Sequence, residues 1–547
     1  MSAVETRLPP GISTVAIVGA ALAGLFGGTH ELVSISMPQG PEVAGMHTAV
    51  QTTGGSALEV WAEPQPAQSL LDGAHTLVLN ALADGAGEFV YAAGAQRGSH
   101  YYGAGVSADG GSDYYDAVLI AYGQHGEARW VRTAGDASEG SSFRSVSTGG
   151  DGTVYAAGWS RGIGPIDLGT GVPLERTTSG TTAILVAYDS DGGVRWAASP
   201  RWEEWDPWGW SLQRIPGHRS GAGPAPRSAF ESVAVDRAGD VYAAGAQRGT
   251  DLYHYGENVS ARATARGSNA LLVKYDASGN AQWARTIGSG AGGSEFLSVA
   301  VDNGGSVYVA GYQDGTEALG YGSGVIARGD SVRTNAVLAK YAPDGTTEWV
   351  RTATGSAGAS RFMSVAVDSD GNVYVVGFQR GSESFTYGRM RIAGPSSGEN
   401  PVLVSFASDG SDRWARTTAA DAVSAFFRSV TVGENGMVYV AGSQFGTVEL
   451  DYGHGVLVTG ESRLGNPIIV RYTREGIARW AATGKANQHG PAFDAVAANG
   501  QEGVLTLAAQ PHVVYDYTFP QSGADPNGEI RTFRSKVLRI VEESGDS

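Results

Sequence analysis

The chain contains no cysteine among its 547 residues. Disulfides, thiolate zinc sites, iron–sulfur clusters and cysteine nucleophiles are therefore excluded. The sequence also lacks an HExxH helix and a P-loop, and its ten histidines show no metal-ligand spacing. We therefore predict no catalytic residue, no metal site and no cofactor.

Basic residues are scarce. The chain has 38 Lys and Arg residues and 55 Asp and Glu residues, which gives a formal charge of −17 and a pI near 5.0. A phosphate backbone is bound by a basic patch, so this balance argues against a nucleic-acid partner or an anionic membrane surface. The acidity is typical of a protein kept soluble by its charge.

Long apolar runs are also missing, apart from residues 13–28. A membrane span needs about 20 residues, so no integral membrane span is predicted. We interpret residues 1–28 as a possible signal peptide with Ala21-Leu22-Ala23 as its cleavage site, although Glu5 partly offsets Arg7. A retained short hydrophobic segment is the alternative. Residues 29–55 read as a linker, and the expected location is extracellular, cell-surface or periplasmic.

Glycine is abundant, with 81 residues, and it separates short Val/Ala/Tyr runs as in an all-β chain. One motif recurs along the chain, and its clearest copy is SRFMSVAVDSDGNVYVVGFQRG at 360–381. A tyrosine, or Leu505 in the last copy, marks the same place in every copy at steps of 64, 87, 66, 66, 65 and 66 residues. The marked tyrosines are Tyr91, Tyr155, Tyr242, Tyr308, Tyr374 and Tyr439. A fixed period of this length indicates a repeat architecture.

Each repeat contains four runs that read as strands. In the unit 296–351 they are FLSVAVD, SVYVAGYQ, NAVLAKYA and TEWVRT, joined by tight turns and one connection of about 20 residues. Four antiparallel strands repeated radially form a propeller blade. The chain begins with a fourth strand at 57–63 and ends with a third strand at 535–543. The sequence therefore predicts an all-β, seven-bladed β-propeller over 57–543, whose last blade pairs these two strands, followed by a tail at 544–547.

The segment FMSVAVDSDGNVYVVGFQ resembles the SBBP-type bacterial β-propeller repeat, and residues 57–543 carry this resemblance. The resemblance implies a propeller of an exported or cell-surface protein, without a common enzymatic activity. The piece KYDASGNAQW at 274–283 is similar to the tryptophan-docking motif of quinoprotein propellers, which implies a tryptophan packed between neighbouring blades.

Residues that recur in every repeat are expected to support the blade itself. We assign this role to the motif tyrosines, to the repeated phenylalanines and to the fourth-strand tryptophans, with the arginine two residues further on forming an ion pair or a stack on the next blade. Turns such as Asp368–Asn372 suit a structural hairpin turn, with a weak calcium loop as the alternative. A glutamine closes the second strand in six blades and Ser160 replaces it in the other. These amides either satisfy the adjacent connection or line a ligand site.

One segment breaks the period. An excess of about 21 residues lies between Trp196 and Phe230 and reads PRWEEWDPWGWSLQRIPGHRSGAGPAP at 200–226. The predicted ligand-binding residues of this insertion are Trp202, Trp205, Trp208, Trp210, Glu203, Glu204, Arg214, His218 and Arg219. Tryptophan rings beside carboxylates suit a sugar or a cation, whereas a plug of the central channel is the alternative.

We therefore predict a non-catalytic binding propeller that holds a carbohydrate or protein partner on the face with the long connections, near the insertion. Two alternatives stay open. The first is a carbohydrate-active enzyme, a glycoside hydrolase or lyase, that uses Glu203, Glu204 and His218 of the 200–226 loop. The second is a purely structural surface protein.

Overall fold

The computed structural model describes residues 49–51, 56–62, 65–66, 76–85, 89–110, 114–123, 125–135, 139–162, 164–169, 173–174, 180–203, 227–419, 423–433, 435–483, 492–499, 503–509 and 535–542. Every regular element among these residues is a β-strand, which confirms the predicted all-β class. Accordingly, no helix in the described ranges is long and apolar enough to cross a membrane.

The described residues include six four-stranded antiparallel units, numbered here sheets 1 to 6, in which the strands lie side by side in chain order. Sheet 1 contains β4 (Thr76–Gly85), β5 (Phe89–Arg97), β8 (Asp116–Gly123) and β9 (Ala128–Thr133). Sheet 2 contains β10 (Ser141–Thr148), β11 (Val154–Arg161), β14 (Thr181–Tyr188) and β15 (Val194–Ala198). Sheet 3 contains β17 (Ser228–Val235), β18 (Val241–Arg248), β21 (Ser268–Tyr275) and β22 (Ala281–Thr286).

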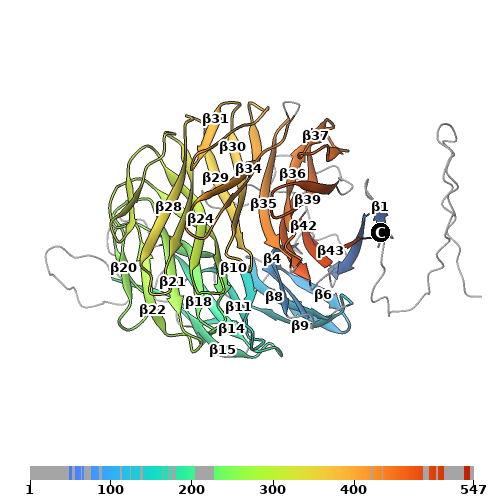
Figure 1. The fold of residues 1–547 in the computed structure, drawn as a ribbon. Helices are drawn as coiled ribbons and strands as arrows, with labels where there is room; N and C mark the ends of the chain where they lie inside the picture. The colour runs from blue at the N-terminus through green and yellow to red at the C-terminus, as the bar shows by residue number, and fades with distance from the viewer. Residues whose placement is uncertain are drawn as a thin grey trace, which may run out of the picture.

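The next three sheets repeat this plan. Sheet 4 contains β23 (Ser294–Val301), β24 (Val307–Asp314), β27 (Thr334–Tyr341) and β28 (Thr347–Thr354). Sheet 5 contains β29 (Ser360–Val367), β30 (Val373–Arg380), β33 (Glu399–Phe406) and β34 (Asp412–Arg416). Sheet 6 contains β35 (Ala425–Val432), β36 (Val438–Phe445), β39 (Gly465–Tyr472) and β40 (Ala478–Thr483). The first strands β4, β10 and β35 lie in the middle of the fold, whereas the fourth strands β15 and β22 lie at its periphery (Figure 1).

A further sheet, the terminal sheet, joins the two ends of the chain. Its order is β1 (Ala49–Gln51), β2 (Ser56–Ala62), β43 (Ser535–Glu542), β42 (Gly503–Ala509) and β41 (Ala492–Asn499). The predicted antiparallel pairing of the N-terminal and C-terminal strands is present, with Leu58 opposite Ile540 and Val60 opposite Leu538. β42 flanks β43 on its other edge, so β43 has a partner on both sides.

The long connections between second and third strands, to which no strand was assigned from the sequence, contain β-hairpins. The paired strands are β6 (Ser99–Gly103) and β7 (Val106–Asp109), β12 (Ile166–Asp167) and β13 (Pro173–Leu174), β19 (Leu252–His254) and β20 (Ser260–Arg262), β25 (Leu319–Gly322) and β26 (Val325–Ala327), β31 (Ser384–Tyr387) and β32 (Met390–Ala393), and β37 (Glu449–Asp451) and β38 (Leu457–Thr459). Two short strands join hairpins from outside, because β3 (Gln65–Pro66) pairs with β6 and β16 (Arg201–Glu203) pairs with β19.

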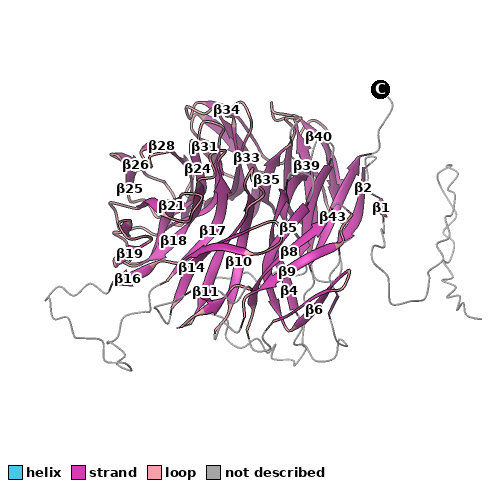
Figure 2. Ribbon diagram, turned by 90° about the horizontal axis from the view of Figure 1, so that it is seen from below, coloured by secondary structure: helices cyan, strands magenta, loops and turns pink. Residues whose placement is uncertain are grey.

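The hydrophobic core lies between consecutive sheets, which stand side by side in Figure 2. Phe143 of sheet 2, for example, is buried in one cluster with Tyr91 and Leu119 of sheet 1. Phe230, Phe296, Phe362 and Phe427 occupy the same place at the following sheets. Leu77 and Ile120 of sheet 1 share a cluster with Ala495 of the terminal sheet. The predicted packing role of the repeated aromatic residues is therefore confirmed for these copies.

The fourth-strand tryptophan and the arginine after it dock onto the next sheet. Trp283 Nε1 donates to the Pro343 carbonyl at 3.0 Å, and Arg285 Nε donates to the Gly345 carbonyl at 2.7 Å. The Arg285 guanidinium also lies over the Trp283 ring, 5.2 Å from its centre. The same contacts join Trp130 and Arg132, Trp349 and Arg351, and Trp414 and Arg416 to the turns that follow them by about 60 residues. The arginine therefore reaches the next sheet, as predicted, but through hydrogen bonds to turn carbonyls; its stack is on the tryptophan of its own strand, not on the next sheet as expected.

A row of serines links the first strands to one another. Ser298 Oγ in β23 accepts the backbone N–H of Val365 in β29 at 3.1 Å. Ser145, Ser232, Ser364 and Ser429 accept the equivalent N–H from the next first strand. Each of these hydroxyls thus binds a backbone donor just beyond the β-bulge of the next first strand.

Removal of residues 535–547 should destroy cooperative folding, because it leaves β2 and β42 as adjacent unpaired edges. The expected result is a broad melting transition with aggregation, measured by calorimetry and light scattering. Removal of residues 544–547 alone is the matched control and should leave both signals unchanged. A 535–547 truncation that melts like the parent would contradict the role given to this pairing.

The docked tryptophan makes Gly345 a sensitive position. This glycine has φ +80°, and a Cβ there would lie 2.8 Å from the Trp283 ring. Gly315 has a similar φ of +74° with no atom near its Cβ position, so Gly315→Ala isolates the backbone strain. Gly345→Ala should lower the free energy of unfolding by about 2 kcal/mol more than Gly315→Ala, because the added methyl overpacks the contact. Equal losses in urea titrations would show that the tryptophan contact is unimportant.

Candidate functional site

The two sides of the sheets differ in how their polar groups are used. The tight turns between first and second strands and between third and fourth strands form the turn side, and the hairpins and crossings form the hairpin side. On the turn side, Asp368 Oδ1 accepts the N–H of Asp370 and Asn372, while Oδ2 accepts the Tyr374 hydroxyl at 3.0 Å. Both oxygens are thus engaged in turn bonds, as the structural prediction for this loop required. No group of three or more His, Asp or Glu able to hold a metal occurs in the described part of the chain.

On the hairpin side, the repeated glutamines hold the hairpins in place. Gln313 is fully buried; its amide donates to the Ala327 carbonyl at 3.4 Å and its oxygen accepts the Tyr321 hydroxyl at 3.1 Å. Gln96, Gln247, Gln379 and Gln444 make the same two bonds to their own hairpins. These glutamines serve the adjacent connection, as the structural interpretation predicted, and do not line a ligand site. Gln510 lies outside the described residues.

The predicted binding insertion is described only at its two ends. β16 pairs with β19, and the Arg227 backbone N–H donates to the Tyr253 hydroxyl at 3.2 Å, so both ends meet at hairpin β19–β20. Trp202 is half-buried and packs against the cluster that contains Tyr253. The other predicted members lie outside the described residues: Trp205, Trp208, Trp210, Glu204, Arg214, His218, Arg219 and the side chain of Glu203.

Positions at the inner edge of the hairpin side depart from the repeat. The residue before the repeated first-strand phenylalanine, or before Leu79 in sheet 1, is Val78, Ser142, Ala229, Glu295, Arg361 or Phe426 in sheets 1 to 6. The residue after the glutamine position is Arg97, Arg161, Arg248, Asp314, Arg380 or Phe445. A side chain that differs between otherwise equivalent sheets is not required by the sheet. In sheets 4 to 6 these positions carry Glu295, Arg361 and Phe426 on the first strands and Asp314, Arg380 and Phe445 on the second strands. These six residues are the candidate site, and the equivalent residues of sheets 1 to 3 lie outside it.

Sheet 4 contributes a buried acid to this site. Glu295 is only 6% exposed; it accepts a hydrogen bond from Ser268 Oγ at 2.8 Å and bonds the Tyr312 hydroxyl. Burial, together with the nearby charge of Glu231, raises the pKa of Glu295 to about 7 despite these bonds and Arg361. Arg361 of sheet 5 lies over the Tyr312 ring, 4.1 Å from its centre. Tyr312 thus bonds to Glu295 within sheet 4 and stacks with Arg361 of sheet 5, which links the two sheets.

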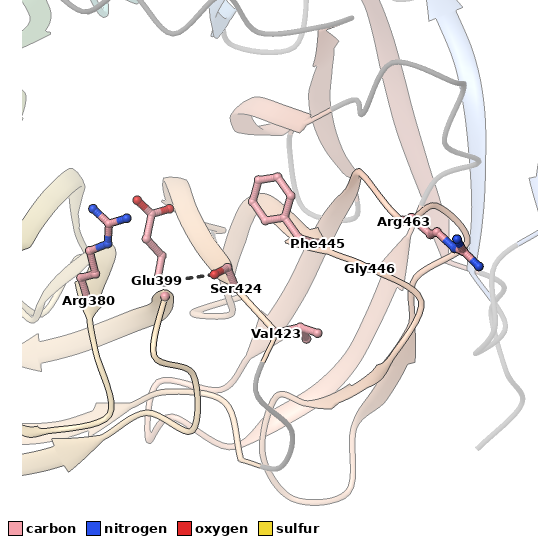
Figure 3. Close-up of a pocket in the computed structure, with 8 residues that line it drawn as sticks. Arg380, Glu399, Val423, Ser424, Phe445, Gly446 and Arg463 are labelled. Carbon is pink, nitrogen blue, oxygen red and sulfur yellow. Dashed lines mark hydrogen bonds between the residues drawn. The ribbon is translucent and has the colours of Figure 1, made fainter.

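An open pocket of about 510 Å³ continues the site between sheets 5 and 6. Arg380 and Glu399, which face each other across β30 and β33, point side by side into the space, and Phe445 lies across from them (Figure 3). Ser424, whose Oγ accepts the Glu399 backbone N–H at 3.2 Å, lies between the two walls, whereas Arg463 points away beyond Gly446 (Figure 3). The pocket therefore offers a guanidinium and a carboxylate on one side and an aromatic ring on the other.

Aromatic and charged groups extend from this pocket along the first strands. The Phe445 and Phe426 rings lie 5.9 Å apart, and Arg428 lies over the Phe426 ring at 4.9 Å. Arg428 also pairs with Asp494 at 3.3 Å. Burial raises the pKa of Glu399, although Arg380, Arg428 and Arg361 oppose the shift. This site was not predicted from the sequence. The available signal was Phe445, which follows the second-strand glutamine at a position where four of the six sheets have arginine.

No protein-family model matches the chain, and no curated protein matches it. Among solved structures, a protein of unknown function from Bacteroides caccae shows 11% identity and a TM-score of 0.30, with 67% of this chain and 90% of that chain covered. A protein of unknown function from Dyadobacter fermentans shows 9% identity and a TM-score of 0.33, covering 73% of this chain and 94% of that chain. Similarities of this size support no statement about function.

Glu295→Gln should flatten the pH dependence of stability. The folded-state pKa of about 7 exceeds the ordinary value of 4.5, so the stability contributed by this carboxyl is complete below pH 4.5 and is lost as the pH rises through 7. The parent should lose about 3 kcal/mol over this window through Glu295 alone. Urea titrations at pH 5 and pH 8 measure the loss. Glu257→Gln, at an exposed position between β19 and β20, is the control and should follow the parent; a Glu295→Gln variant that also follows it would contradict the assignment.

Proposed function

We propose that the protein is a seven-bladed β-propeller whose function is non-catalytic binding on the hairpin side. Three features support the ring. The first strands of sheets 1 to 6 contact one another in chain order, and β35 contacts β41. β4 in turn contacts β41, so sheet 1 and the terminal sheet are neighbours. An antiparallel sheet that combines strands from both ends of the chain fits a last blade that holds the ring closed.

One observation supports the binding function above all others. The residues that recur in every sheet are used in turns, hairpins and contacts between sheets, whereas the residues that vary gather at the inner edge around an open pocket. A rigid repeat scaffold that leaves one edge free to vary is the arrangement that binding proteins use. Binding at this edge, in an exported protein as the apolar segment 13–28 suggests, is the function that we assign.

The tryptophan-rich insertion is a second contributor to the same side. It leaves the sheets at β16 and returns at Arg227, both of which lie at hairpin β19–β20 of sheet 3. The pocket lies between sheets 5 and 6. The two elements are thus separable by mutation, and each is tested by itself.

A glycan and peptide array with the full chain tests the proposal. Phe445→Arg replaces the ring with the residue that sheets 1, 2, 3 and 5 carry there, so the fold should persist while pocket binding falls. Deletion of residues 203–222 with a short Gly/Ser link removes the insertion and restores the usual crossing length. We expect an array signal from the parent that at least one of the two variants loses, with melting temperatures unchanged. Loss in neither variant, or no signal from the parent, would contradict the proposal.

A further inference from the structure

The pocket between sheets 5 and 6 has a composition that selects among ligand classes. One wall carries the Arg380 guanidinium and the Glu399 carboxylate, and Phe445 forms the opposite wall (Figure 3). Phe445 is 38% exposed although it is a large apolar side chain. An exposed ring beside paired polar groups suits a ligand with an apolar face and polar edges.

The charge of the pocket differs from that of the whole chain. The protein carries −17, yet Arg361, Arg380 and Arg428 all act electrostatically on Glu399. Arg428 is compensated by Asp494. The charged side chains that line the pocket are Arg380, Arg463 and Glu399, so two guanidinium groups exceed the single carboxylate and the pocket lining is net positive in an acidic protein.

Arg380 is placed to contact a ligand. Its guanidinium is exposed, and its cross-strand neighbour Glu399 does not lie within ion-pair distance. A guanidinium binds a carboxylate through two parallel N–H donors. Glu399 can accept hydrogen bonds from ligand hydroxyls, since a carboxylate is an acceptor only.

Resting on the proposed binding function, we infer that this pocket binds an acidic saccharide, with the uronate carboxylate on Arg380, ring hydroxyls on Glu399 and the apolar face of the sugar ring on Phe445. A pocket of about 510 Å³ lies within the size range of small-ligand sites. An acidic peptide would meet the same guanidinium, but it offers neither the vicinal hydroxyls that suit Glu399 nor a flat apolar face for the phenyl ring.

Calorimetric titration of the full chain with tri-galacturonate tests this inference. The companion ligands are its methyl ester, which lacks the charge, neutral maltotriose and a tri-glutamate peptide. The free acid should bind, and the ester should bind about tenfold or more weakly, because a charge-assisted hydrogen bond is lost. Equal binding of acid and ester, or binding of tri-glutamate in preference to the saccharide, would overturn the inference.

Variants tie the binding to the pocket. Arg380→Met keeps the length of the side chain and should abolish the preference for acid over ester, whereas Phe445→Ala, which removes the ring without adding a charge, should weaken acid and ester alike. Arg248→Met changes the equivalent residue of sheet 3, which follows Gln247 as Arg380 follows Gln379, and should change nothing. An equal loss in Arg248→Met and Arg380→Met would locate the effect outside the pocket and overturn the inference.

The inference and the proposed function can fail separately. An array ligand that is neutral or peptidic and is lost in Phe445→Arg would preserve the binding function and reject the acidic saccharide. A ligand lost only on deletion of residues 203–222 would assign binding to the insertion and would also reject this use of the pocket. A parent that binds nothing on the array or by titration would reject both.

Discussion

In sheets 1, 3, 4 and 5, docking onto the next sheet depends on a tryptophan and an arginine that share one face of the fourth strand, whereas Trp196 of sheet 2 docks without such an arginine. The indole N–H and the guanidinium each donate to a carbonyl in a tight turn of the following sheet, as Trp283 and Arg285 do at Pro343 and Gly345. The turn glycine provides both a positive φ and space for the ring. Since the contact spans about 60 residues and recurs, it fixes the spacing of the sheets and hence the period of the sequence.

This docking assigns different roles to the two sides of the fold. The turn side is occupied by Asp-turn and Trp-turn bonds, in which side chains satisfy backbone groups and one another. On the hairpin side, the buried glutamine and the hairpin tyrosine hold each hairpin against its own sheet. Because the turns and hairpins are held by these repeated bonds, they do not require particular side chains at the inner edge. The residues at that edge can therefore differ from one sheet to the next.

The electrostatics of the inner edge follow from its partial burial. Glu295 is withdrawn from water, so its charged form loses solvation that Ser268 and Tyr312 replace only in part, and its pKa rises to about 7. Arg361 stacks on Tyr312 and keeps its charge beside this acid. The balance of charge around Arg380 and Glu399 is thus set by neighbours from three sheets. Titration of Glu295 therefore changes the net charge of this edge between pH 5 and pH 8.

The sequence by itself determined the elements that local pattern and repetition encode. Strand periodicity, turn residues and the Tyr, Trp, Phe and Gln positions all follow from physics that acts within one repeat, and their recurrence marked them as structural. The pairing of β2 with β43 could also be predicted, because each strand lacked its partner in the count of repeats. The hairpins could not, since strands of two to five residues are too short to show a usable periodicity. Only the tertiary structure brought Arg361 over Tyr312 and placed Phe445 opposite Arg380. The two residues of each pair come from different sheets, 49 and 65 positions apart, and their contacts depend on the register of neighbouring sheets, which no local pattern records.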